Sequence, residues 1–217
     1  MSAREGELAI AARAVNQNLW LVTVVAVGNM AIAGGFWTYI SLAGFVAAFL
    51  ARIVLLGRIA GSLQDIKLGP ASDLLKQYWL NYFVVMTLLA LPVWLASFVS
   101  ESLQVGWTGR ALVEVARSLI GVLTIFVLPI VFLRRVGPVA IPAGLVYLLR
   151  TWPAGVSVSA ITLLAFAIGT VRLPILMLGG TLIAPAAVLV SIVVTYLLTI
   201  AFAAGCQILI QAKSAPA

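Results

Sequence analysis

The sequence predicts an all-α integral membrane protein, built as a single transmembrane domain over residues 1–217. Its residues are 64% hydrophobic and only 9% charged, whereas soluble domains carry about 25% charged residues. The apolar residues lie in long runs, and a helix of about 20 residues crosses a hydrocarbon core of about 30 Å. Short polar stretches with most of the basic residues separate these runs. We therefore expect six transmembrane helices as three hairpins, each preceded by a cytoplasmic interfacial segment, at about 19–33, 36–56, 79–99, 111–133, 152–171 and 185–210.

The first hairpin follows an amphipathic stretch. Residues 1–18 place apolar and charged side chains at helical spacing, which is typical of a helix lying on a membrane surface. The run from Ala14 to Ala51 contains no charge and would be about 57 Å long as one helix. Because Gly34-Gly35 interrupts this run, we expect it to fold back on itself as two spans.

The second hairpin begins after Gly69-Pro70. Residues 68–78 form a short polar approach, and aromatic residues of the kind that gather at membrane interfaces follow. The second span of this hairpin is short, because Arg117 and Arg134 bound it closely. We therefore expect the helix to begin before Arg117, with the Arg117 guanidinium extended outward to the interface.

The third hairpin follows Gly137-Pro138, and its first span lies between Arg150 and Arg172. The last apolar run is too long for one helix, and its first third holds Pro174, Gly179-Gly180 and Pro185. Residues 173–185 are accordingly expected to form an irregular or re-entrant segment before the last span. A seventh short span is the alternative.

The basic residues predict the orientation. With six spans, only Arg110, Arg117 and Arg172 of the 13 lysines and arginines fall on one side of the membrane. The positive-inside rule then places both termini in the cytoplasm, and we expect a multi-pass protein of the inner (cytoplasmic) membrane. Because the basic residues are scattered and form no run, nucleic acid is not an expected partner.

Tryptophan opens each odd-numbered span, at Trp20, Trp79 and Trp152. This spacing indicates three repeated units, although tryptophan also gathers at interfaces without any repeat. The layout, with Gly69-Pro70 leading to Tyr78-Trp79, resembles bacterial membrane families of helix-plus-hairpin units. These include the YciC-like proteins and the membrane domain attached to some glycerophosphodiesterases. The first unit lacks the Gly-Pro pair. The resemblance implies an accessory or membrane-organising role.

Few residues offer reactive chemistry. The chain has no histidine and one cysteine, Cys206, which makes metal, haem and triad chemistry improbable. We expect no enzyme and no cofactor. Arg110, Glu114 and Arg117 are spaced to share one helical face. That cluster is either an intramembrane ion or proton site or an ion-paired, solvated face at the outer interface.

Two asparagines and a set of small residues complete the candidates. Asn29 and Asn81 fall inside predicted spans, where they line a substrate path or form hydrogen bonds between helices. Small residues recur every four positions on the second and last spans and let helices approach closely, within the chain or against a partner. This packing stripe comprises Ala187, Ser191, Thr195 and Thr199, with Ala43 and Ala47 on the second span.

The favoured function is that of a non-catalytic accessory or scaffold subunit that packs against protein partners or lipids. Its expected partners are the lipid bilayer and either another membrane protein or a second copy of the chain. The alternative is a small-solute or ion transporter or channel. Its site would be the broken helix near 173–185, because broken helices at membrane depth often build substrate sites.

Overall fold

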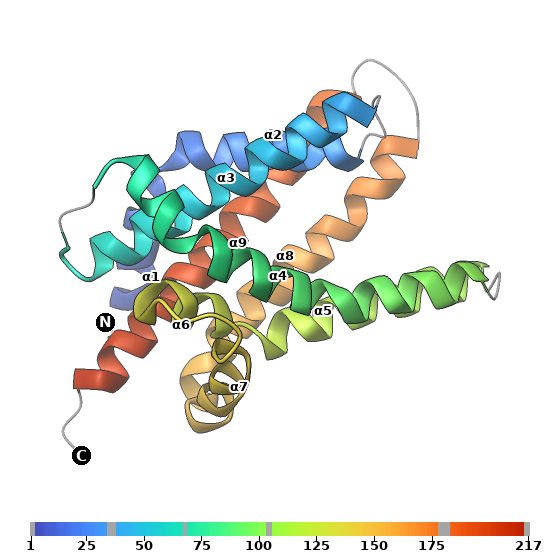
Figure 1. Ribbon diagram of the computed structural model, residues 1–217. Coiled ribbons are helices and arrows are strands. Elements are labelled where there is room, and N and C mark those ends of the chain that lie inside the picture. Colours follow the sequence, from blue (N-terminus) through green and yellow to red (C-terminus); the bar gives the residue numbers. More distant parts are fainter. Residues whose placement is uncertain (1–2, 34–37, 67–68, 103–105, 178–182, 215–217) are drawn as a thin grey trace.

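The computed structural model describes residues 3–33, 38–66, 69–102, 106–177 and 183–214, and within these ranges it is helical without a strand (Figure 1). Three segments, Leu42–Leu63, Ala71–Val99 and Pro185–Ala212, are long and apolar enough to cross a membrane. Three pairs of bent helices raise that number to six if each pair is one span. The predicted helical class with several membrane-crossing helices is confirmed. The helices are α1 (Ala3–Asn16), α2 (Leu19–Ala33), α3 (Thr38–Leu63), α4 (Ala71–Ser102), α5 (Gly106–Leu123), α6 (Val127–Arg134), α7 (Ala140–Arg150), α8 (Trp152–Met177) and α9 (Ile183–Ser214).

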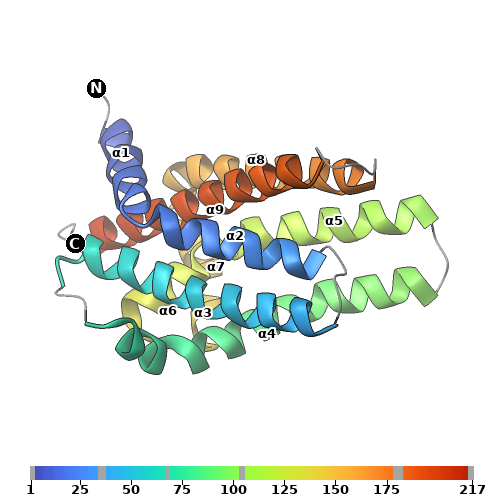
Figure 2. The ribbon, with the colours of Figure 1, turned by 90° about the horizontal axis from the view of Figure 1, so that it is seen from above.

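Helices that follow one another in the chain pack as pairs, α2 with α3, α4 with α5 and α8 with α9. Helix α9 lies at the centre and contacts α1, α2, α3, α6 and α8. The helix ends near the two termini gather at one end of the bundle, and the far ends of the three pairs lie at the other (Figure 2). Figure 1 shows α4 and α5 leaving the other two pairs at an angle.

Two of the three expected approach segments are separate helices. Helix α1 meets α2 at a bend of 77°, where the Asn18 side-chain amide donates to the Ala14 carbonyl oxygen at 3.0 Å and ends the first helix. Helix α7 meets α8 at 116°, next to Pro153, which has no backbone N–H to continue the helix.

The second unit differs from the expectation. Residues 68–78 form no separate approach helix among the described residues, because α4 runs without a break from Ala71 to Ser102. No glycine or proline occurs between Ala71 and Leu91, so nothing in this stretch favours a break.

Several helix ends also differ from the predicted limits. Helix α3 continues past the predicted end at residue 56 to Leu63. The span expected at 111–133 is instead two helices bent by 40°. The bend precedes Pro129, which cannot donate a hydrogen bond to the Ile125 carbonyl oxygen.

The expected irregular segment is partly helical. Residues 173–177 continue α8 as far as Met177, and α9 begins at Ile183. The intervening residues, 178–182, lie outside the described part of the chain. No candidate for a seventh span is found among the described residues, where at most six are present.

An aromatic cluster joins α4 to the centre of the bundle. Tyr78 and Tyr82 are buried, and the ring centroid of Phe132 lies 4.7 Å from that of Tyr78 and 5.7 Å from that of Phe202. The Tyr78 hydroxyl donates to the Phe132 carbonyl oxygen at 3.2 Å. These contacts connect α4, α6 and α9 at the end of the bundle that holds the termini.

Gly28 allows α2 and α3 to come into close contact. A Cβ atom at this position would lie 2.7 Å from both the Ala48 Cβ and the Gly44 carbonyl oxygen. Real Cβ atoms do not approach a neighbour so closely, and the backbone oxygen cannot move independently of its helix. Only glycine therefore fits this crossing.

We predict that Gly28→Ala destabilises the protein by about 1–3 kcal/mol, because the added methyl group forces α2 and α3 apart. Thermal unfolding in detergent, followed by circular dichroism, measures the change. The matched control is Gly169→Ala in α8, where the nearest atom to the new Cβ is 3.9 Å away and the helix gains up to about 1 kcal/mol in propensity. Equal midpoints for the two variants would contradict the close approach.

Candidate functional site

A cavity of about 450 Å³ lies where α4 and α5 diverge from the rest of the bundle. This volume is within the range of about 300–1,000 Å³ that is typical of small-molecule sites. Helices α3, α4, α5, α8 and α9 supply most of its walls. We call it the central cavity.

Each wall of the central cavity is one face of a helix. On α4, Met86, Leu89, Ala90, Val93, Trp94 and Ser97 line it, at the spacing of three and four residues that places side chains on one helical face. Helix α5 contributes Arg117, Ile120 and Gly121 with Thr124 just beyond its end, and α9 contributes Thr195, Leu198, Thr199, Ala201 and Phe202. Further lining residues are Val25, Arg52, Leu55, Leu56, Ile125, Leu128, Thr162 and Phe166.

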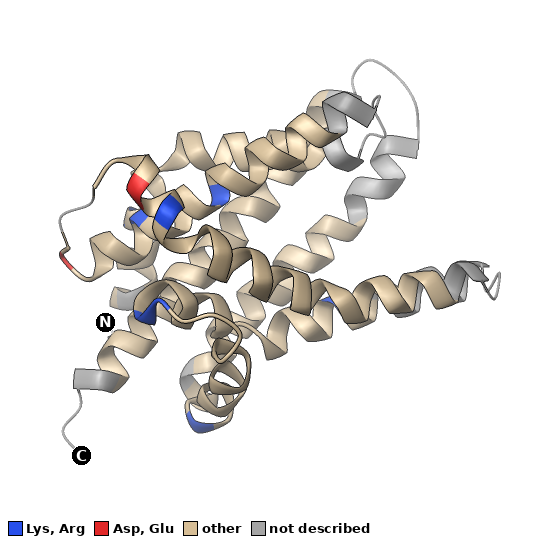
Figure 3. Ribbon diagram, in the orientation of Figure 1, with Lys and Arg blue, Asp and Glu red and all other residues tan. Residues whose placement is uncertain are grey.

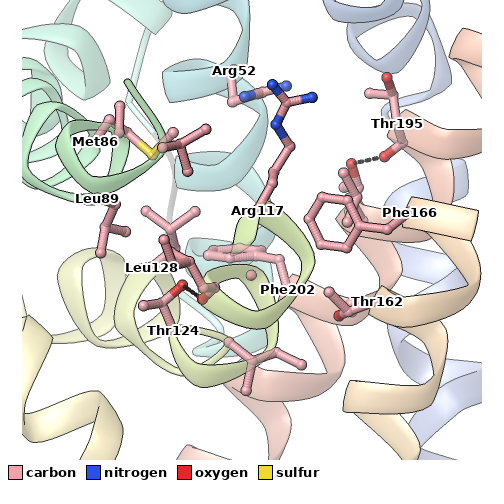
Figure 4. Close-up of a pocket in the computed structure, with 18 of the residues that line it drawn as sticks. Arg52, Met86, Leu89, Arg117, Thr124, Leu128, Thr162, Phe166, Thr195 and Phe202 are labelled. Carbon is pink, nitrogen blue, oxygen red and sulfur yellow. Dashed lines mark hydrogen bonds between the residues drawn. The ribbon is translucent and has the colours of Figure 1, made fainter. Parts of the chain in front are cut away.

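Two arginines of the cavity lining point toward one another. In Figure 4 the side chain of Arg117 rises from α5, and its guanidinium group points toward that of Arg52 on α3. Arg52 is half-buried, and no hydrogen bond or ion pair joins its side chain to another described residue. Among the described residues that line the cavity, Arg52 and Arg117 are charged and none is a carboxylate. The rest of this described lining is mostly apolar.

Arg52 lies deep in its helix. It stands at the middle of Leu42–Leu63, about 17 Å along α3 from Leu63 at a rise of about 1.5 Å per residue. Residues of α3 that follow Arg52 in the chain, including Leu55 and Leu56, are buried. An arginine at this depth is rare in apolar helices and marks a functional site more often than a structural one.

Most hydroxyl groups in the cavity already donate to their own helices. Thr162 donates to Val158, Thr199 to Thr195 and Ser97 to Val93, at distances of 2.7–2.9 Å to the carbonyl oxygens. Thr124 likewise donates to the Ile120 carbonyl oxygen. The oxygens of these hydroxyl groups can still accept hydrogen bonds, but their protons are already donated to backbone carbonyl oxygens. The two guanidinium groups are thus the main donors that a ligand would meet.

Thr195 differs from these hydroxyls. Its side chain is only 6% exposed and lines the central cavity, and no hydrogen bond of its hydroxyl group is found within the described residues. It offers a further donor to a ligand in the cavity.

A second cavity of about 400 Å³ adjoins the first. Arg52, Met86, Ala90 and Trp94 line both cavities, and Asn29 lines the second. Arg52 thus stands between Asn29 on one side and Arg117 on the other.

The structure separates the polar residues that the sequence singled out. Arg117 is exposed, lines the central cavity and points toward Arg52. Asn81 has a different role. Its side-chain amide donates to the Arg135 carbonyl oxygen at 3.2 Å and joins α4 to the end of α6. Arg110 and Glu114 belong to α5, but their side chains lie outside the described residues.

The residues of the packing stripe fall into a buried group on α9 and an exposed group on α3. Ala187, Ser191, Thr195 and Thr199 of α9 are buried within this chain, and the Ser191 hydroxyl donates to the Ala26 carbonyl oxygen of α2 at 3.2 Å. Thr195 and Thr199 line the cavity as well. Ala43 and Ala47 of α3 are exposed.

Arg52 is the site residue that the sequence reasoning missed. The predicted second span, 36–56, ends four residues after Arg52, and the sequence pattern assigns this arginine no role. The signal that could have identified it is the apolar sequence after it, Ile53-Val-Leu-Leu56 and Ile59-Ala60, with no Gly-Pro pair before Gly69. That continuation places Arg52 inside a helix rather than at its end.

No metal site is found in the described part of the chain, where no three histidine, cysteine, aspartate or glutamate residues gather. No family model, curated protein or solved structure matches the chain. The resemblance to helix-plus-hairpin membrane families therefore stays a prediction.

We predict that Arg52→Met stabilises the ligand-free protein by about 1 kcal/mol or more, because it removes a poorly solvated charge that faces a second cation. Thermal unfolding in detergent at low salt measures the effect. Arg58→Met, on the same helix but outside both cavities, should change stability by less than about 0.5 kcal/mol. A lower midpoint for Arg52→Met would show instead that Arg52 supports the fold.

Proposed function

We propose that the protein is a six-span carrier of the inner membrane that binds an anionic ligand in the central cavity. The observation that carries this proposal is that the Arg52 and Arg117 side chains line one cavity and point toward one another. Guanidinium groups bind carboxylate and phosphate oxygens with two parallel hydrogen bonds.

The bent helices support six spans. Three pairs of bent helices are each long and apolar enough to be one membrane span. They are α1 with α2, α5 with α6 and α7 with α8. Together with α3, α4 and α9 they would give the three hairpins of the sequence prediction. In this arrangement α1 and α7 lie along the membrane surface.

The charge distribution supports the orientation. Most of the described basic side chains gather at the end of the bundle that holds the termini (Figure 3). They lie at helix ends, as Arg13 does in the last turn of α1, Arg134 in that of α6 and Arg150 in that of α7. By the positive-inside rule this end is cytoplasmic.

Transport, rather than fixed binding, is favoured by the position of the site and by the backbone around it. Secondary transporters bind their substrates near the middle of the bilayer, and Arg52 stands at the middle of its apolar segment. Pro92 within α4 and the break between α5 and α6 give the α4–α5 hairpin two weak points. Movement there would open or close the cavity. The proposed site is thus the arginine pair and not residues 173–185.

We predict that oxyanions bind the purified protein and that Arg52→Gln or Arg117→Gln weakens this binding about tenfold or more, because each removes a charged hydrogen-bond partner. Titration of phosphate, acetate and their longer-chain derivatives, followed by tryptophan fluorescence, measures the affinities. Arg52→Lys should restore part of the affinity, since it keeps the charge but not the planar donor pair.

Arg58→Gln is the matched control for these variants, since it removes a cation from α3 outside both cavities. It should bind every anion as the unaltered protein does. Uptake of the best ligand into proteoliposomes then separates a carrier from a receptor. Binding that is unchanged in both Arg52→Gln and Arg117→Gln would refute the anion site.

An accessory or scaffold role is the second candidate, and exposed Ala43 and Ala47 on α3 favour it. Small residues on an outer helix face let a partner helix approach closely. Replacing both by leucine should then dissolve a complex or homo-oligomer that is stable in mild detergent. If the assembly survives this change, the α3 face is not its interface.

A further inference from the structure

The central cavity contains far more apolar wall than a small oxyanion can use. Its cationic groups are confined to Arg52 and Arg117, whereas Leu89, Val93 and Ile120 line the region beyond them. A small, fully polar anion held at the arginines would leave these side chains facing empty space. The shape and chemistry of the cavity therefore call for a ligand with an anionic part and an apolar part.

The hydrogen-bonding capacity of the wall excludes a strongly polar body for that ligand. The hydroxyl protons of Ser97, Thr162 and Thr199 are donated to carbonyl oxygens of their own helices. Away from the arginines, a sugar or peptide in the cavity would replace few of its hydrogen bonds to water, at a cost that opposes binding. An acyl chain loses no hydrogen bonds there.

The cavity is open, and its mouth is apolar. Trp94 lines the cavity while 65% of its side chain is exposed. Its exposed neighbours on α4 are Leu91 and Leu95, and Leu119 is exposed on α5. If α4 crosses the bilayer, this mouth faces lipid. A ligand with a hydrocarbon chain can then enter sideways from the bilayer without crossing water.

We propose that the ligand of this site is a single-chain anionic amphiphile, a molecule with a carboxylate or phosphate head and one acyl chain. The head binds between Arg52 and Arg117, and the chain lies along Leu89, Val93 and Ile120 and leaves past Trp94. A cavity of about 450 Å³ is near the lower end of ligand-site volumes, which favours one chain over two. The inference rests on the proposed anion site and adds the class of ligand.

The test compares matched probes on the full chain in a neutral detergent. Oleate and 1-oleoyl lysophosphatidate carry the anionic head and the chain, monoolein carries the chain alone, and acetate and inorganic phosphate carry the head alone. Binding is followed by the thermal shift of the protein and by tryptophan fluorescence, because Trp94 lies at the mouth. Each probe is titrated against the unaltered protein, Arg52→Gln, Ala90→Trp and Arg58→Gln.

The two anionic chain-bearing probes should bind at least about tenfold more tightly than monoolein and than the heads alone. Arg52→Gln should weaken them about tenfold. Ala90→Trp, which fills the wall between Leu89 and Val93 with an indole, should weaken the chain-bearing probes more than acetate and phosphate. Arg58→Gln should behave as the unaltered protein, and the loss of binding in Arg52→Gln alone of these two variants excludes nonspecific partition into micelles.

Two results would overturn the inference, and they can be told apart. If acetate or phosphate binds as tightly as its chain-bearing counterpart and depends on Arg52, the anion site stands but the amphiphile is refuted. If no probe binds in a manner that depends on Arg52 and Arg117, both the anion site and the amphiphile are refuted. Equal binding of monoolein and oleate would also refute the amphiphile, because the head charge would then have no role.

Discussion

Close packing around α9 is the constraint on which the rest of the structure depends. In lipid, helices associate through van der Waals contact between small residues and not through the hydrophobic effect. Residues 201–206 of α9 are all buried, and a Cβ on Gly205 would lie 3.0 Å from the Pro129 Cγ of α6. Five helices meet α9 in this way. Helix α4 is joined to it through the aromatic cluster near one end, so α4 and α5 diverge farther along and leave the central cavity.

The two arginine side chains in that cavity are energetically unfavourable in their mostly apolar surroundings. A cation at the centre of a bilayer-spanning helix costs about 2.5–3.5 kcal/mol on insertion scales, and apolar side chains of similar size would fill the space without this cost. Arg52 and Arg117 nevertheless face one another, with no carboxylate in the described lining. The proposed anionic ligand would account for two arginines in one cavity better than stability does.

The sequence identified some site residues and misread others for definite physical reasons. Arg117 was singled out for its charge, but its place in the lining of the central cavity depends on where the neighbouring helices leave space. Asn81 has a structural role at the end of α6, which depends on a contact between residues 54 positions apart in the chain. Arg52 was overlooked because a charge ends an apolar run in the sequence, whereas α3 continues through it to Leu63.

By itself, the sequence determined that this protein is helical and apolar enough to cross a membrane several times. These are local features. Long apolar runs favour helices that satisfy their own backbone hydrogen bonds, and Gly34-Gly35 and Pro153 favour breaks between helices. It did not determine whether residues 68–78 form their own helix, because no local signal separates them from the helix that follows. The tertiary structure alone decided that the Thr195 and Thr199 face of α9 packs within the chain and that Arg52 meets Arg117. Both outcomes depend on the angle between helices, which is set by side-chain contacts between distant parts of the chain.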